Sequence, residues 1–240
     1  MAVFLTHVAV ALVVPKLPDG RALRLTIPGY GHGVGTGGHV WPAASVLCRY
    51  LASRQQEVEG ARVCELGSGI GAVGLYVAAL GARSVVMTDM DPQVRDLAAE
   101  NVEQNRALLC TNTSVFCRTF SWGTPIERLS RDPDFDLVLG SDITYKPRQH
   151  RLLCATLAEL LLRDPSEGRP PSRAVIAHTH RPVSDVLNGG VEGLEHLRRT
   201  ASKAGLHTRT LHAEHRNLAK VSVVEMTLQQ GQGDGPIPTT

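Results

Sequence analysis

Three closely spaced glycines have the residue types and spacing needed to hold a phosphate- or nucleoside-type ligand. Residues 62–74 read R-V-C-E-L-G-S-G-I-G-A-V-G, an apolar run followed by Gly67, Ser68, Gly69 and Gly71. Glycine backbones accept positive φ and let a ligand approach without a Cβ in the way, and amides at the start of a following helix can face that ligand. The segment therefore predicts a buried strand, a ligand-binding loop and a helix.

Two acidic residues narrow the choice of cofactor. Residues 84–89 read S-V-V-M-T-D, and Asp89 at the end of this apolar run can bind ribose hydroxyls in a site for NAD or for S-adenosylmethionine (SAM). Glu65 precedes the glycines, where dinucleotide folds usually carry a small or apolar residue and SAM-dependent methyltransferases usually carry an acid. The G-x-G-x-x-A pattern from Gly67 also fits the dinucleotide fingerprint. We expect SAM, with an NAD-dependent oxidoreductase as the less favoured alternative.

A second group of polar residues follows the apolar run at 135–140. Ser141, Asp142 and Tyr145 stand directly after it. In open α/β sheets ligands bind outside the carboxyl ends of the strands, so we expect these side chains beside the glycine loop. Asp142 can attract a cationic lysine and help to aim its amine at a sulfonium methyl group. The alternatives are an N-cap role for Asp142 and a core position for Tyr145.

The elements that must position these residues follow from an alternation of apolar runs and helical periodicity. Strands are expected at 62–66, 84–88, 113–117, 135–140, 173–178, 206–212 and 219–228, and helices at 40–53, 71–80, 92–106, 148–162 and 184–203. The last two strands have no helix between them and must pair antiparallel. We expect an α/β fold with a Rossmann-like, seven-stranded, mostly parallel sheet, an antiparallel C-terminal strand and helices on both faces.

The ends of the chain are expected to lie outside this sheet. Residues 1–36 are predicted to contain a β-hairpin, in which 8–14 pair with 22–27, and the start of a glycine-rich loop over 29–38 that can move over a ligand. Residues 37–230 form the predicted methyltransferase domain, and 231–240 a disordered tail. The apolar opening lacks a basic n-region and is too short to span a membrane, so neither a signal peptide nor a membrane span is expected.

Composition excludes several classes of partner. The chain has 240 residues and a formal net charge of +2, from 25 basic and 23 acidic side chains, which gives no field for nucleic acid or an anionic membrane. The five cysteines form no C-x-x-C pair and are expected to be buried thiols in a reducing, cytoplasmic compartment. His178 and His180 lack a third ligand, so no metal is expected.

Six motifs in a fixed order resemble the family 16 seven-β-strand protein lysine methyltransferases, over residues 37–162. They are G-x-x-V-W-P-A-A-x-x-L-x-x-Y-L from Gly37, E-L-G-S-G-I-G-A-V-G-L from Glu65, V-V-M-T-D from Val85, N-V-x-x-N from Asn101, S-W-G from Ser121 and D-L-V-L-G-S-D-I-T-Y from Asp136. The family's D-x-x-Y element is here Asp142 to Tyr145. The resemblance implies transfer of methyl groups from SAM to lysines of non-histone proteins such as heat-shock chaperones, the AAA ATPase valosin-containing protein and elongation factors.

The resemblance also implies a role for each matched residue. The implied SAM site comprises Trp41, Glu65, Gly67, Ser68, Gly69, Asp89, Trp122 and Ser141. Trp122 would flank the adenine and Asp89 would bind the ribose, while Asp142 and Tyr145 would border the lysine channel. Core packing is the alternative for the two tryptophans. A histidine, arginine or small-molecule acceptor and a non-catalytic interaction module remain open, and a monomer is expected.

Overall fold

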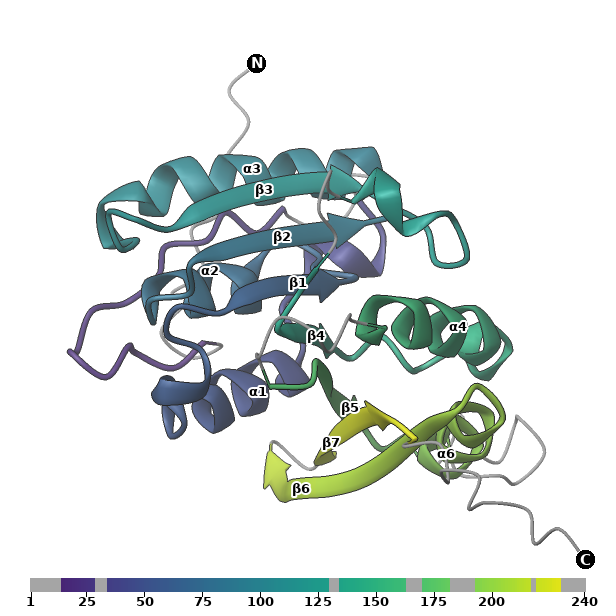
Figure 1. The fold of residues 1–240 in the computed structure, drawn as a ribbon. Helices are drawn as coiled ribbons and strands as arrows, with labels where there is room; N and C mark the ends of the chain where they lie inside the picture. The colour runs from purple at the N-terminus through teal and green to yellow at the C-terminus, as the bar shows by residue number, and fades with distance from the viewer. Residues whose placement is uncertain are drawn as a thin grey trace, which may run out of the picture.

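The predicted alternation of strands and helices is confirmed in the computed structural model, which describes residues 14–28, 34–129, 134–162, 170–181, 193–216 and 219–229 (Figure 1). The strands are β1 (Arg62–Leu66), β2 (Ser84–Asp89), β3 (Ser114–Thr119), β4 (Leu137–Ser141), β5 (Arg173–Thr179), β6 (Leu206–Arg216) and β7 (Ala219–Leu228). The helices are α1 (Pro42–Ala52), α2 (Ala72–Ala79), α3 (Pro92–Asn105), α4 (His150–Leu161) and α6 (Gly193–Lys203).

One seven-stranded sheet organises the fold, in the order β3-β2-β1-β4-β5-β7-β6. Strands β1 to β5 pair in parallel, whereas β7 runs antiparallel to both β5 and β6. The predicted fold class is therefore confirmed. Because the strand order reverses between β1 and β4, the carboxyl ends of these two strands flank the switch point at which open α/β sheets bind ligands.

Helices cover both faces of the sheet, and each face has its own hydrophobic core. Helices α1, α2 and α3 pack over one face, where Leu47 and Leu75 are fully buried. Helices α4 and α6 pack over the other, with Leu157 and Leu197. The central strands are mostly apolar because alternate side chains of a parallel strand enter opposite cores.

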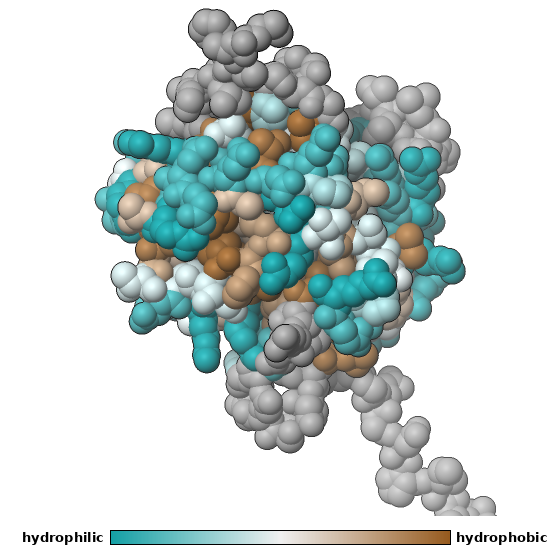
Figure 2. All heavy atoms as spheres, turned by 90° about the horizontal axis from the view of Figure 1, so that it is seen from above, coloured by the Kyte–Doolittle hydropathy of each residue, from teal (hydrophilic) through white to brown (hydrophobic). Residues whose placement is uncertain are grey.

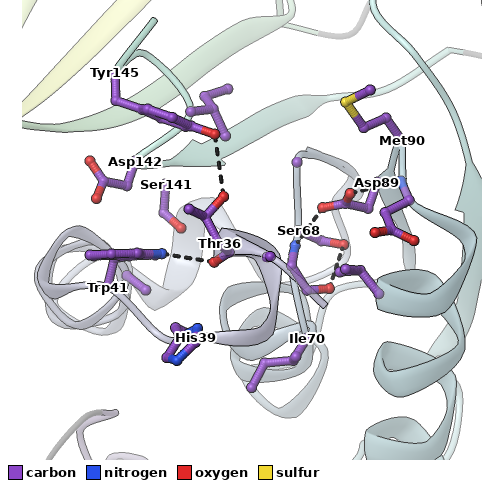
Figure 3. A pocket seen from close by; sticks show the side chains of 18 of the residues that line it. Thr36, His39, Trp41, Ser68, Ile70, Asp89, Met90, Ser141, Asp142 and Tyr145 are labelled. Atoms are coloured by element: carbon purple, nitrogen blue, oxygen red, sulfur yellow. Dashed lines mark hydrogen bonds between the residues drawn. The ribbon is translucent and has the colours of Figure 1, made fainter. Parts of the chain in front are cut away.

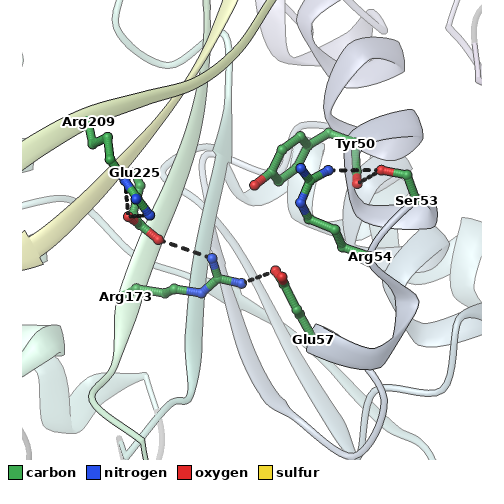
Figure 4. Close-up of polar contacts among 7 residues, drawn as sticks. All are labelled: Tyr50, Ser53, Arg54, Glu57, Arg173, Arg209 and Glu225. Atoms are coloured by element: carbon green, nitrogen blue, oxygen red, sulfur yellow. Dashed lines mark hydrogen bonds and ion pairs between the residues drawn. The ribbon is translucent and has the colours of Figure 1, made fainter.

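An ionic network closes the amino end of β5 (Figure 4). Arg173, the first residue of that strand, pairs with Glu57 of the short 3₁₀ turn η3 (Gln55–Glu57) and with Glu225 of β7. Glu225 also pairs with Arg209 of β6. The network thereby joins four elements that are distant in sequence.

The predicted N-terminal hairpin is wrong for the part that the structure describes. Residues 8–13 lie outside the described residues, and 22–27 form no strand. Their backbone bonds instead to side chains of α3, because the Arg24 N–H donates to Asn105 Oδ1 at 2.8 Å and the Thr26 N–H to Asn101 Oδ1 at 2.7 Å. Two asparagines thus replace the partner strand that the β-type pattern of 22–27 suggested.

The structure describes some of the other predicted segments only in part. Of the glycine-rich loop, 34–38 are described and include the 3₁₀ turn η2 (Thr36–Gly38). The helix predicted from residue 184 is described from Gly193, and the predicted tail lies outside the described residues. No helix within the described ranges is both long and apolar enough to cross a membrane. The α3 and β3 side seen in Figure 2 is mainly hydrophilic, with hydrophobic patches between the polar residues.

Candidate functional site

A cavity of about 730 Å³ opens at the carboxyl ends of β1, β2 and β4. Its volume lies in the range of about 300–1,000 Å³ that is usual for small-molecule sites. Every predicted site residue except Glu65 lines it: Trp41, Gly67, Ser68, Gly69, Asp89, Trp122, Ser141, Asp142 and Tyr145. Figure 3 shows Asp142 and Tyr145 on one side, Ser68 and Asp89 on the other, and Thr36 between them. The sheet topology has therefore brought two separate sequence clusters into one site.

The glycine loop is closely covered, which explains why it carries no side chains at two positions. Gly67 and Gly69 have φ of +61° and +55°, values that L-residues rarely adopt. A Cβ at Gly67 would lie 2.7 Å from Cγ2 of Ile143, and one at Gly69 would lie 2.8 Å from the carbonyl oxygen of Gly37. The loop is thus held between the segment at 34–38 and the residues that follow β4, and it presents bare backbone to the cavity.

Asp89 is fixed by backbone amides at the end of β2. Its Oδ2 accepts a hydrogen bond from the Gly69 N–H at 3.1 Å, and its Oδ1 accepts one from the Asp91 N–H at 3.1 Å. Burial raises the pKa of the Asp89 carboxyl, while these amide hydrogen bonds lower it. The carboxylate therefore stands preoriented in the cavity wall, where it can accept hydrogen bonds from the hydroxyls of a ribose.

Glu65 does not reach the cavity. It shares its face of β1 with Val63, so its side chain enters the core below α2, where it is fully buried. Oε2 accepts a hydrogen bond from the Gly74 N–H at 2.8 Å, and Oε1 has no partner among the described residues. Burial raises the pKa of Glu65 to about 8. In this structure the carboxylate binds a backbone amide of the helix that follows the loop, and Glu65 is not among the residues that line the cavity.

Asp142 is held in an uncommon backbone conformation. Its φ is 58°, and no other non-glycine residue of the described ranges has positive φ. The side chain is buried, and both of its oxygens pair with the Arg181 guanidinium, with 2.9 Å between Nη1 and Oδ1. These contacts leave the N-cap alternative without support. Non-glycine residues with left-handed backbone cluster at functional sites, because the strain persists only where the surroundings enforce it.

Thr36 joins the loop before α1 to the D-x-x-Y element. The Trp41 indole N–H donates to the Thr36 carbonyl oxygen at 3.0 Å, and the Tyr145 hydroxyl lies 3.3 Å from Thr36 Oγ1. Trp41 is 40% exposed, which excludes core packing as its role, whereas Trp122 is half-buried against the second core and also lines the cavity. The two tryptophans therefore face the site from opposite faces of the sheet.

Sequence reasoning missed Arg181 and Thr36. Arg181 lies two residues after β5, and the rule that strand ends carry the site would have selected it, as it selected Asp89 and Asp142. The neighbouring histidines have structural partners: His178 Nδ1 lies 2.7 Å from Thr144 Oγ1, and His180 Nε2 lies 2.8 Å from Ser222 Oγ.

No cluster of three or more potential metal ligands occurs among the residues that the structure describes. The five cysteines are free thiols, of which Cys48, Cys64 and Cys154 are buried as expected, whereas Cys110 is exposed.

Comparison with known proteins identifies the family of this chain. The family described as lysine methyltransferase (Methyltransf_16) matches residues 21–185. Because that match covers more than half of the 240 residues, the chain belongs to this family.

Two relatives show how far the likeness extends. The chain is 38% identical over 141 residues to EEF1A lysine methyltransferase 3 of Xenopus tropicalis, which covers 59% of each protein. It is 37% identical over 130 residues to the protein N-lysine methyltransferase METTL21A of Danio rerio, with 53% of this chain and 56% of the relative covered. The chain therefore spans a little over half the length of these relatives.

A solved structure supports the fold. Magnesium protoporphyrin IX methyltransferase (ChlM) from Synechocystis PCC 6803 with bound SAH superposes with a TM-score of 0.57 at 16% identity, over 78% of this chain and 81% of that one. The shared architecture is the class I methyltransferase fold that the motifs predicted.

Proposed function

We propose that this protein is a SAM-dependent methyltransferase that modifies a lysine side chain of a non-histone protein. The observation that carries the proposal is the meeting, in one cavity, of a bare glycine loop with the D-x-x-Y residues Asp142 and Tyr145. Membership of the lysine methyltransferase family supports the same reading.

The cavity suits S-adenosylmethionine in three respects. Gly67 and Gly69 line the cavity with backbone and carry no side chain that could fill it. Asp89 offers a fixed carboxylate to ribose hydroxyls, and Trp122 offers an aromatic surface to adenine. When bound, the cofactor supplies an electrophilic methyl group on a sulfonium sulfur. Glu65 would act on the cofactor only through the loop and α2.

The acceptor must arrive as a neutral amine. An unperturbed lysine has a pKa of about 10.4, so removal of its proton precedes attack. The lysine Nζ then forms a bond to the methyl carbon as the carbon–sulfur bond breaks, and the proton of the product ammonium passes to solvent. Tyr145 would border the amine and exclude water, Asp142 would fix the direction of its lone pair, and Trp41 would contact the cofactor.

The kind of substrate is proposed from resemblance. One relative is named for the elongation factor EEF1A, and the family's range suggests chaperones, AAA ATPases or elongation factors as substrates. We further propose a monomeric enzyme in a reducing, cytoplasmic compartment, which the free thiols favour.

Transfer of labelled methyl from SAM into proteins of a cell lysate tests the proposal. Wild type should label a discrete band in which amino-acid analysis identifies methyl-lysine, and Asp142→Ala should lose at least about 100-fold of this rate while still binding SAM. Label in methyl-histidine, methyl-arginine or a small molecule would assign one of the alternative acceptors. SAM binding without any transfer would favour the non-catalytic role, and absence of SAM binding would refute the proposal.

A further inference from the structure

The carboxylate best placed to receive a lysine ammonium is already paired inside the chain. Arg181 donates from Nη1 to Asp142 Oδ1 at 2.9 Å, and its Nη2 pairs with Oδ2. Nη1 also donates to the carbonyl oxygen of Thr179 at 3.3 Å, which ties the guanidinium to the end of β5. Two parallel N–H···O bonds make this a bidentate pair, the geometry in which arginine holds a carboxylate most firmly.

The two side chains of the Asp142–Arg181 pair differ in exposure. The Asp142 side chain is 3% exposed and the Arg181 side chain is 31% exposed. Both residues line the cavity, and the guanidinium is the more exposed member of the pair. An ammonium that enters the cavity therefore meets a carboxylate that is already paired with a cation.

Two aromatic residues of the cavity wall lie close to the same guanidinium. The Arg181 Cζ atom is 5.9 Å from the ring centroid of Trp41 and 5.9 Å from that of Tyr145. Aromatic faces attract a guanidinium at such distances, so the rings and the carboxylate together fix its place. Arg181 is thus a fixed part of the cavity wall beside Asp142 and Tyr145.

We propose that Arg181 is a positioning and specificity-determining residue for the acceptor: balanced by Asp142, it admits a neutral amine and rejects a permanently charged guanidinium. The inference rests on the proposed function. A lysine can lose its proton before it enters, but an arginine side chain cannot be deprotonated in a protein. A fixed cation at the entrance therefore favours the reactive form of lysine and disfavours arginine as an acceptor.

Other charges face the same space and must be kept constant in the test. The cavity is also lined by His39, Asp89, Asp91, Tyr145 and Lys146. Of these, Lys146 lies with Nζ 5.0 Å from the Tyr145 ring centroid. The substitutions below leave all of them unchanged, so a difference in pH profile reports on the Asp142–Arg181 pair.

The experiment compares wild type with Arg181→Gln, Asp142→Asn, the double variant and Arg181→Lys. The rate of methyl-lysine formation in lysate proteins is measured from pH 7 to 9.5 with labelled SAM, and the affinity for S-adenosylhomocysteine is measured by calorimetry. We expect Arg181→Gln to lose at least about tenfold in rate at pH 7.5, to recover part of it as pH rises, and to change the affinity for S-adenosylhomocysteine less than about threefold. The ratio of methyl-arginine to methyl-lysine should increase.

The remaining variants show whether Asp142 acts by holding Arg181 or by direct contact with the acceptor amine. If Asp142 acts by holding Arg181, the double variant should be no slower than Arg181→Gln, because the two losses are not additive. Arg181→Lys should keep the wild-type pH profile at a reduced rate. It replaces Arg181→Gln as the test variant if thermal unfolding shows that Arg181→Gln is not folded at the assay temperature.

Contrary outcomes are distinct from failure of the proposed function. Arg181→Gln at least as active as wild type, with Asp142→Asn still inactive in that background, would mean that Asp142 receives the ammonium directly and would overturn the inference. An Arg181→Lys variant with the pH profile of Arg181→Gln, or an unchanged methyl-arginine ratio, would also overturn it. Absence of methyl-lysine from the wild-type reaction would refute the proposed function itself.

Discussion

Strand β5 has an arginine near each end, and the two arginines have different surroundings. Arg173 opens the strand and shares its charge between Glu57 and Glu225, which in turn binds Arg209 (Figure 4). Arg181 follows the strand and pairs with the carboxylate of the buried Asp142. Only the second pair lines the cavity.

The difference indicates what each pair is for. The Arg173 network joins η3, β5, β6 and β7 on ordinary backbone, and we infer that it stabilises the fold. The Arg181 pair instead depends on a left-handed residue, Asp142, whose strain stabilises nothing by itself. We infer that the carboxyl ends of the strands are arranged for chemistry and the amino ends for stability. Substitutions at matched positions test this difference.

The largest effect is expected at the two ends of β1. Gly69→Ala should weaken S-adenosylhomocysteine binding by at least about tenfold, since it adds left-handed strain and a Cβ 2.8 Å from the Gly37 carbonyl. Gly60→Ala is the matched control, because Gly60 has φ of +72° but no atom within 4 Å of its Cβ position. That variant should lose stability and keep its affinity, as measured by calorimetry and thermal unfolding. Equal losses of affinity in Gly69→Ala and Gly60→Ala would contradict the difference in role between the carboxyl and amino ends of the strands.

The buried acid under the glycine loop gives the second test. Unlike Glu225, which binds two arginines, Glu65 accepts one amide hydrogen bond, and burial raises its pKa to about 8. Its reference pKa is 4.5, so the folded state holds a proton that the unfolded state releases between these values. Stability from this group is fully present below pH 4.5 and is lost as pH rises through about 8, at no more than about 1.4 kcal/mol per pH unit.

Denaturant unfolding of wild type and Glu65→Gln from pH 5 to 9 measures this contribution by difference. The comparison is needed because burial and neighbouring cationic groups lower the pKa of His178 to about 3, which gives the opposite slope at acidic pH. Glu65→Gln should be relatively more stable at pH 9 than at pH 5. Parallel curves for the two proteins would show that the Glu65 carboxyl is not protonated in the fold.

The third prediction concerns the amino end of β5. Arg173→Met should lower the free energy of unfolding by about 1–3 kcal/mol, because the half-buried Glu57 and the more deeply buried Glu225 lose a shared cation. Methyl transfer at 25 °C should be unchanged, since no member of the network lines the cavity. Urea unfolding and the initial rate of methyl-lysine formation check the two halves. A large loss of rate in a folded Arg173→Met variant would contradict the division of roles.

The parts of this division that sequence can predict are local ones. The bounds of β1 and β2 could be predicted from apolar runs that end at glycine or an acid. The rule that ligands bind at the carboxyl ends of strands selected Asp89 and Asp142. Pairings across long separations were not accessible: Asp142 and Arg181 are 39 residues apart, and Glu57 and Arg173 are 116 apart.

Local sequence patterns failed to predict two placements for the same physical reason. Glu65 was expected at the ligand because it precedes the glycines, but the alternation of side chains along β1 directs it into the core below α2. Residues 22–27 have a strand-like pattern, yet Asn101 and Asn105 of α3 take their backbone hydrogen bonds. In both cases a partner supplied by tertiary packing decided the outcome, and the local pattern contained no information about it.

The smallest predicted effect completes the comparison at a single carboxylate. Arg173 and Arg209 both bind Glu225, at 3.1 and 2.8 Å, but their side chains are 23% and 65% exposed. An exposed ion pair is screened by water and salt and is worth about 0–1 kcal/mol, so Arg209→Met should lower the free energy of unfolding less than Arg173→Met does, by about 0.5 kcal/mol. Urea unfolding of both variants at low and high salt measures the difference. A larger loss of unfolding free energy in Arg209→Met than in Arg173→Met would contradict this prediction. It would mean that burial is not what makes the network at the amino end of β5 stabilising.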